Sequence, residues 1–117
     1  MTAVLWGIRQ CDTMRKAMRW LDARGVDWTF RDYRDPPVDD ETLRRWAAVA
    51  GWERLLNRRG LTWRKLDADA RADLDAEKAL GLMREHPTLI KRPVLELDDG
   101  RVEIGFSPER YAALFHD

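Results

Sequence analysis

The chain has 117 residues, and its 21 lysines and arginines are balanced by 21 aspartates and glutamates, so its net charge is near zero. This length suits one domain with a single core. The charge balance disfavours a dedicated nucleic-acid binder, which usually carries a basic excess. No apolar run approaches the ~20 residues of a membrane span, and the N-terminal residues lack a signal-peptide pattern. A single cysteine excludes an internal disulfide and is typical of a reducing compartment. We therefore expect a cytoplasmic protein with neither a membrane nor a nucleic-acid partner.

The first third of the sequence predicts a strand, a helix and a second strand. Residues 2–8 are mostly apolar, as in a central parallel strand. Apolar side chains then repeat at helical spacing from about Thr13 to Arg24, and Gly25 provides the helix end. Residues 26–31 alternate apolar and polar, which predicts a half-buried strand. A strand–helix–strand of this length forms a right-handed parallel unit.

The middle of the chain, from Asp39 to His86, predicts helices only. Apolar stripes at 43–50, 52–56 and 79–83 mark three of them. We expect residues 61–66 to form an irregular apolar connector, and the Ala/Asp-rich stretch around Leu74 to hold a further short helix. The sequence thus predicts a single domain over 1–117, with a core at 1–35 and 88–117 and a helical insertion at 38–87.

The last third returns to strands and closes with a helix. Residues 94–97 and 101–104 flank Asp98-Asp99-Gly100, and Asp-Gly is a strong hairpin signal. Ser107-Pro108 predicts a capped helix start with proline at the first position. A parallel unit, a hairpin and a closing helix predict an α/β (α+β) thioredoxin-like fold. Its sheet would be mixed and four-stranded, and its insertion all helical.

Cys11 is the first candidate for chemistry because it lies where the first strand passes into the first helix. A thiol there faces the positive end of the helix dipole and unbonded backbone N–H groups, which favour thiolate. Such settings lower a cysteine pKa from about 8.5 into roughly the 3.5–7.5 range. Asp12 is a candidate cap for this helix. The alternative is that Cys11 is simply a small buried apolar residue.

Arg92-Pro93 is the second feature, and it stands just before the third predicted strand. A turn there would bring the Arg92 guanidinium near the sulfur, where it could stabilise thiolate and hold an oxyanion with two hydrogen bonds. The alternative is a plain surface turn leading into a strand. The two histidines, His86 and His116, have no partner at metal-ligand spacing, so we expect no metal site.

Four segments of the chain together carry a family resemblance. They are Leu5-Trp6-Gly7-Ile8-Arg9-Gln10-Cys11-Asp12-Thr13, Leu55-Leu56-Asn57-Arg58-Arg59-Gly60, Pro87-Thr88-Leu89-Ile90-Lys91-Arg92-Pro93 and Gly105-Phe106-Ser107. In this order they resemble the glutaredoxin-coupled arsenate reductase (ArsC) family, most closely its YffB-like branch, and the resemblance covers essentially the whole chain. It implies a thioredoxin-like fold with a helical insertion, a cis-proline at Pro93, a nucleophilic Cys11 and a supporting Arg92.

The resemblance also indicates residues that bind substrate, and it shows two departures from the family pattern. Arsenate reductases of this family surround the oxyanion with three arginines, and only Arg92 matches one of them. The other two positions hold Asn57 and Phe106. Each lost charge-assisted anchor is worth about 1.5–3 kcal/mol, and Arg58 or Arg59 is a candidate substitute. The predicted substrate-binding residues are Gln10, Asp12, Thr13, Asn57, Arg58, Pro93 and Phe106.

The favoured function is a cytoplasmic thiol oxidoreductase with a single nucleophilic cysteine and no bound cofactor. Without a second cysteine, an external thiol must complete the cycle, and we expect glutathione as this co-substrate. The substrate would be a small oxyanion or a thiol compound. One alternative is a true arsenate reductase coupled to glutaredoxin. Another is a non-catalytic regulator of the Spx type that binds RNA polymerase. Spx proteins typically carry Cys-x-x-Cys, but Met14 at the fourth position excludes that disulfide switch here.

Overall fold

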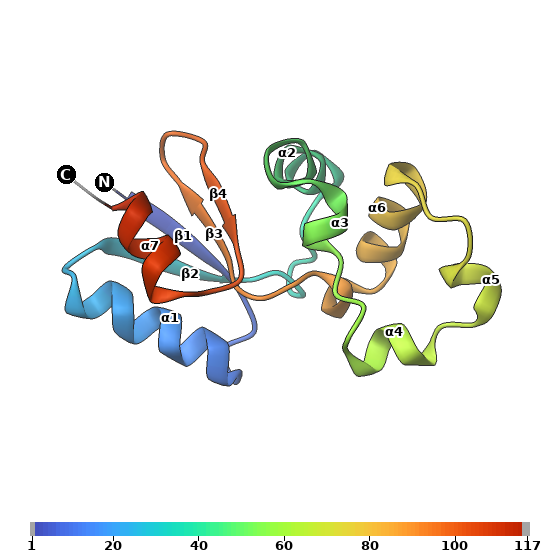
Figure 1. The fold of residues 1–117 in the computed structure, drawn as a ribbon, viewed down its shortest axis with the longest axis horizontal. Helices are drawn as coiled ribbons and strands as arrows, with labels where there is room; N and C mark the ends of the chain where they lie inside the picture. Colours follow the sequence, from blue (N-terminus) through green and yellow to red (C-terminus); the bar gives the residue numbers. More distant parts are fainter. Residues whose placement is uncertain (1, 116–117) are drawn as a thin grey trace. The chain divides into compact units, whose positions relative to one another are not determined.

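The computed structural model describes residues 2–115 and divides the chain into two compact units. The first, here the thioredoxin-like unit, comprises Met1–Tyr33 and Arg92–Asp117. The second, here the helical unit, comprises Arg34–Lys91. Figure 1 labels the elements of both units. None of the helices over residues 2–115 is long and apolar enough to cross a bilayer.

The helical unit begins four residues before the predicted insertion at 38–87 and ends four residues after it. The reason is hydrogen bonding within the helical unit. The N–H of Lys91 donates to the carbonyl of Leu55 at 2.9 Å. Arg34 pairs with Pro37 in an isolated bridge. These contacts assign both segments to the helical unit.

A four-stranded sheet forms the centre of the thioredoxin-like unit (Figure 1). Its strands are β1 (Thr2–Gly7), β2 (Asp27–Asp32), β3 (Val94–Leu97) and β4 (Val102–Ile104), in the order β2-β1-β3-β4. Strand β1 pairs with β2 in parallel, and β1 with β3 and β3 with β4 pair antiparallel. This confirms the mixed sheet expected from the sequence.

Two helices, α1 (Asp12–Ala23) and α7 (Pro108–Leu114), pack on one face of this sheet. The register pairs Ala3 with Leu97 and Leu5 with Leu95, so these four side chains share a face. The apolar stripes of the helices close over them. The resulting buried cluster consists of Ala3, Leu5, Met14, Ala17, Leu21, Leu95, Leu97 and Tyr111.

Local chemistry explains how the two helices begin. The Ser107 hydroxyl accepts a hydrogen bond from the N–H of Arg110 at 3.1 Å, so the predicted cap of α7 is present. In α1, the Met14 side chain packs against the backbone of Gly7. A Cβ on Gly7 would lie 2.4 Å from the Met14 sulfur, so any larger residue there would force the Met14 side chain to move.

The helical unit contains five short α-helices and one 3-10 turn among the described residues. The prediction of an irregular connector at 61–66 is wrong, because Leu61–Lys65 form a helix. This helix has no side-chain cap, since Gly60 precedes it, so its start left no sequence signal. The short helix expected around Leu74 lies just before that residue. The elements are α2 (Asp40–Ala50), α3 (Trp52–Leu55), α4 (Leu61–Lys65), α5 (Ala68–Arg71), α6 (Ala76–Glu85) and η1 (Pro87–Leu89).

Caps and ion pairs fix these short helices. The side chains of Asp39, Asp67 and Asp75 each accept a backbone N–H bond at 2.8 Å at the start of α2, α5 and α6. Arg44 of α2 reaches Glu77 of α6 through two hydrogen bonds of 2.6 and 2.8 Å. It also donates to Asp40, which accepts a further bond from Arg84. Isolated helices of this length are marginal in water, so these contacts and tertiary packing hold them.

Candidate active site around Cys11

Cys11 lies at the junction that the sequence indicated, four residues after the end of β1 at Gly7. Its backbone is extended, and its carbonyl accepts the first helical hydrogen bond, from the N–H of Arg15 at 3.0 Å. Cys11 is therefore the N-cap residue of α1, and Asp12 is not the cap. Asp12 begins the helix, is exposed, and pairs with Arg15 at 3.0 Å. The thiol itself is free and half-buried.

The surroundings of the Cys11 sulfur favour its anionic form. Partial burial raises the pKa of the thiol. Hydrogen bonds from the N–H of Met14, the Arg92 guanidinium and the N–H of Thr13 lower it by more, so the net pKa lies below the ordinary value. The first N–H groups of α1 thus favour the thiolate, as the start of a helix does with anions.

Arg92 belongs to the segment that enters β3, and its peptide bond to Pro93 is cis, as the family resemblance implied. The guanidinium is partly buried, and its Nη1 donates to the Tyr33 hydroxyl at 3.3 Å. Burial lowers the pKa of Arg92, but the contacts with Tyr33 and Cys11 raise it by more, so the group stays protonated. Pro93 is buried, and its carbonyl accepts the N–H of Gly105 at 2.8 Å. The chain is thereby tied to the segment after β4.

Tyr33 is a site residue that the sequence analysis did not predict. It follows β2 directly, its side chain is fully buried, and its N–H donates to the carbonyl of Gly7 at 3.4 Å. The sequence did contain a signal for the position of Tyr33. Because β1 and β2 are parallel, the residues after both strands meet at one edge of the sheet. A large polar aromatic after β2 therefore comes to the same edge as Cys11.

The other predicted residues of the thioredoxin-like unit differ in their surroundings. Gln10 and Thr13 flank the cysteine region and are exposed. Phe106 is half-buried, and its ring stands edge-on to Tyr111 with 4.8 Å between the ring centroids. The structure thus shows Phe106 as a packing residue of the core. A role for these three in substrate binding stays a prediction.

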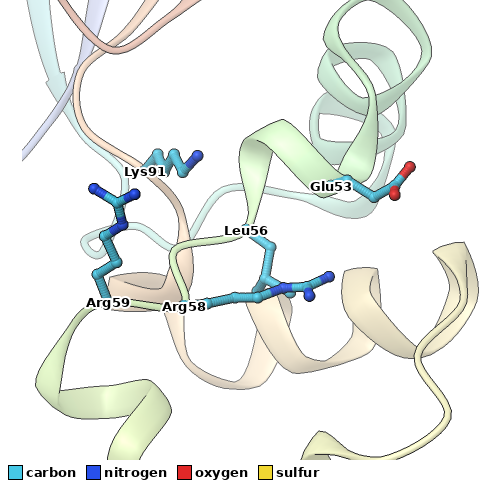
Figure 2. Close-up of a pocket in the computed structure, with 5 residues that line it drawn as sticks. All are labelled: Glu53, Leu56, Arg58, Arg59 and Lys91. Atoms are coloured by element: carbon cyan, nitrogen blue, oxygen red, sulfur yellow. The ribbon is translucent and has the colours of Figure 1, made fainter.

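Asn57 and Arg58 belong to the helical unit. The Asn57 side chain accepts the N–H of Arg59 at 3.0 Å, and the N–H of Asn57 donates to the carbonyl of Leu89 at 2.7 Å. Arg58 and Arg59 line a cavity of this unit that the sequence did not predict (Figure 2). Among residues 2–115, no three His, Cys, Asp or Glu side chains are grouped as a metal site would need. His116 lies outside the described residues.

Comparison with known proteins supports the assignment suggested by the motifs. A family model described as the ArsC family matches residues 6–114. An uncharacterized protein of Haemophilus influenzae is 40% identical over 111 residues, which are 95% of this chain and 96% of that protein. The global transcriptional regulator Spx of Enterococcus faecalis is 28% identical over 101 residues, which are 85% of this chain and 75% of Spx.

Solved structures give the same result. A structure named YffB is 54% identical with a TM-score of 0.90, and the match covers 95% of this chain and 96% of that one. The arsenate reductase of Vibrio cholerae is 21% identical with a TM-score of 0.84, covering 98% of each chain, and shows a shared fold only. With a family match over nearly its whole length and a 40% identical relative, the chain belongs to the ArsC family, as its motifs predicted.

Proposed function

We propose that this protein is a thiol oxidoreductase in which Cys11 is the nucleophile and glutathione is the external thiol. The observation that carries the proposal is the position of the half-buried Cys11 as the N-cap residue of α1, where the first N–H groups of the helix and the Arg92 guanidinium lower the pKa of its thiol. The thiolate is the reactive form of cysteine. Positive groups in such a position stabilise the thiolate at neutral pH and can also bind an anionic substrate.

The reaction consists of two thiol–disulfide exchanges. The Cys11 thiolate attacks the glutathione sulfur of a mixed disulfide R–S–S–G. A Cys11–S–S–G bond forms, the bond between R–S and the glutathione sulfur breaks, and R–S⁻ leaves. A second glutathione thiolate then attacks the glutathione sulfur of this intermediate. It forms oxidised glutathione, and the Cys11 thiolate leaves and is restored. Arg92 lowers the cysteine pKa, which makes Cys11 a better leaving group in the second step.

The chain has only one cysteine, and this cycle uses only one, because glutathione supplies the second thiol. Glutaredoxin is a candidate partner that would regenerate the thiol in place of free glutathione. Arg92 would bind a glutathione carboxylate or a small oxyanion, since guanidinium binds such groups with two hydrogen bonds. A reducing compartment such as the cytoplasm suits this chemistry.

The test is an intact-mass measurement of the glutathione adduct. Wild-type protein incubated with oxidised glutathione should gain one glutathione at Cys11, and Cys11→Ser should gain none. Arg92→Met should slow adduct formation about tenfold near pH 6, which corresponds to a rise of about one unit in the thiol pKa. Arg19→Met, which removes an exposed arginine of α1, is the matched control and should react as wild type does. An equal adduct on Cys11→Ser would contradict the proposal.

A regulator of the Spx type is a second candidate, because relatives named Spx match most of this chain. Those proteins are described as global transcriptional regulators. In that case the chain would bind RNA polymerase and its cysteine would be dispensable. A purified polymerase that binds wild-type protein and Cys11→Ala equally well, with no glutathione adduct on either, would favour the regulator over the enzyme.

A further inference from the structure

The helical unit contains a cavity whose lining is dominated by cations, and its volume is about 320 Å³. It is lined by Glu53, Leu56, Arg58, Arg59 and Lys91 (Figure 2). The lining carries three positive side chains and one negative side chain, a net charge of two positive units. In Figure 2, Arg59 and Lys91 lie together, whereas the Arg58 guanidinium extends toward the side of Glu53. The whole chain, by contrast, is neutral. We propose that this cavity binds a phosphate monoester group of a small phosphorylated metabolite.

Backbone pairing builds the wall of the cavity. Leu56 and Ile90 form an isolated antiparallel bridge. On either side of it, the N–H of Asn57 donates to Leu89 at 2.7 Å and the N–H of Lys91 donates to Leu55 at 2.9 Å. Segments far apart in the chain are thereby locked together, and Lys91 is brought beside the Arg58–Arg59 turn. The site is thus part of the fold of the helical unit.

Side-chain contacts hold the two arginines in place. The Arg58 guanidinium carbon lies 5.8 Å from the ring centroid of Trp52 and 5.8 Å from that of Trp63. Cation–π contacts on both rings restrict this long side chain. The Asn57 side chain accepts a hydrogen bond from the backbone N–H of Arg59. This bond holds the turn that carries the Arg59 side chain. An anion would therefore meet one guanidinium, that of Arg58, whose conformational freedom is already reduced, and a second, that of Arg59, on a turn whose backbone is held.

The arginines of the cavity also differ from others in the same unit in their charge partners. Arg44 and Arg84 are matched by Asp40 and Glu77. Among residues 2–115, no carboxylate forms an ion pair with Arg58 or Arg59. Figure 2 shows Glu53 across the lining from Arg59 and Lys91, with its carboxylate directed away from them. A bound anion would therefore pair with Arg58 and Arg59, as the carboxylates of Asp40 and Glu77 pair with Arg44.

Charge and size together select the ligand class. A phosphate monoester carries close to two negative charges near pH 7, which matches the two guanidinium groups of Arg58 and Arg59, whereas a carboxylate matches only one of them. Arginine forks bind phosphate oxygens with two hydrogen bonds. The volume is at the low end of ligand pockets, which suits a metabolite. A neutral chain lacks the basic excess of nucleic-acid binders. Phosphate binding in this cavity does not depend on the chemistry of Cys11.

The test is a titration of the full-length protein with glycerol 3-phosphate at constant ionic strength, without any thiol. Saturable NMR shifts are expected at the amides of Arg59 and Gly60 and at the indole N–H groups of Trp52 and Trp63. Arg59→Gln should raise the Kd about tenfold, the loss expected for one charge-assisted partner. Arg71→Gln, which removes an exposed arginine of α5 outside the cavity, should leave the Kd unchanged.

Further titrations distinguish a phosphate ligand from a carboxylate and from a nucleic acid. Glycerol alone should cause no shifts, and acetate should bind more weakly than glycerol 3-phosphate. Equal binding of acetate would overturn the phosphate assignment, and so would tighter binding of oligothymidylate, which would make the surface a nucleic-acid site. Unchanged affinity in Arg59→Gln would also overturn it. None of these outcomes affects the glutathione adduct at Cys11, so the two proposals fail or stand separately.

Discussion

Two regions of this protein use arginine in opposite ways. On the surface between α2 and α6, Arg44 is bonded to both Asp40 and Glu77, so its charge is compensated within the fold. At the edge of the sheet, Arg92 is partly buried and contacts a thiol and a phenol. Among residues 2–115 it forms no ion pair with a carboxylate. The first arrangement stabilises structure, and the second leaves positive charge available to a thiolate.

This contrast indicates where candidate functional cations lie in a chain with equal numbers of positive and negative charges. The net charge does not indicate a binding site here, because the charges of 21 basic and 21 acidic residues cancel. What matters is which cations lack a carboxylate partner. Within the described residues these include Arg92 near Cys11, and Arg58 and Arg59 at the cavity of the helical unit. Arg58 and Arg59 are exposed, whereas Arg92 is half-buried. A half-buried cation without an anion costs solvation energy, so the position of Arg92 calls for a chemical reason.

The strongest effect should come from a mutation that tests the separateness of the two units. Leu5 is fully buried in the core cluster of the thioredoxin-like unit, so Leu5→Ala should lower the free energy of unfolding by about 2–5 kcal/mol. Amide hydrogen exchange should accelerate in β1, β3 and α1 more than in α2 and α6, because every member of that cluster belongs to one unit. Thr29→Ala, at an exposed position of β2, is the control and should change stability by about 0.5 kcal/mol or less. Equal acceleration in both units would mean that they unfold as one.

The next effect compares two buried tyrosines of the thioredoxin-like unit. Tyr33→Phe removes the hydroxyl that accepts a hydrogen bond from Arg92, and bonds to charged groups are worth about 1.5–3 kcal/mol. Stability should fall by that amount. The thiol pKa should rise because the guanidinium is less firmly held, and alkylation rates measured against pH would show this.

Tyr111→Phe is the matched control for that experiment. The Tyr111 hydroxyl is buried and has no hydrogen-bond partner among the described residues, and burial raises its pKa. Removing an unpaired buried hydroxyl should leave stability unchanged or increase it by about 1 kcal/mol, with no effect on Cys11 alkylation. A loss of stability in Tyr111→Phe as large as in Tyr33→Phe would indicate that the loss comes from the space each hydroxyl fills, and that the hydrogen bond from Arg92 adds nothing.

The sequence predicted the thioredoxin-like unit well because its signals are local and strong. Strand β1 is a continuous apolar run, Gly25 stands at the end of α1, and Ser107-Pro108 opens α7 with a real cap. Binary pattern and turn chemistry agree at each of these places, and consistent signals make such predictions reliable. The position of Cys11 at the helix start followed from the same pattern.

The sequence predicted less of the helical unit and of the site's supporting residues, because those depend on contacts distant in sequence. Helix α4 has five residues and no side-chain cap, so propensity alone could not define it. The bridge of Leu56 to Ile90 joins segments far apart in the chain. Tyr33 approaches Arg92 across 59 residues of sequence. Its position required the parallel pairing of β1 and β2 to be followed to the strand ends.

A smaller effect follows from the pKa of Cys11. That pKa is lower in the folded protein than in the unfolded chain, so the folded state binds fewer protons between the two values. The contribution to stability is fully present above the ordinary thiol pKa of about 8.5 and is lost as the pH falls through the folded value. The difference in unfolding free energy between wild type and Cys11→Ser should therefore grow with rising pH. A difference that is flat between pH 5 and about 9 would show that the thiol is not activated.

The weakest effect is expected at Arg44, although this arginine forms two short ion pairs, of 2.8 Å with Asp40 and 2.6 Å with Glu77. Arg44 holds the pKa of Glu77 and of Asp40 below their ordinary values. Both carboxylates therefore stabilise the fold above their unfolded pKa and lose that contribution as the pH falls. All three groups are exposed, and exposed pairs are weakened by salt. Arg44→Met should thus lower the midpoint of thermal unfolding slightly in low salt and hardly at all in about 1 M NaCl. An equal fall in the unfolding midpoint at both salt concentrations would mean that the Arg44 side chain stabilises α2 and α6 by packing. Arg44 and Arg92 would then differ in burial rather than in charge compensation.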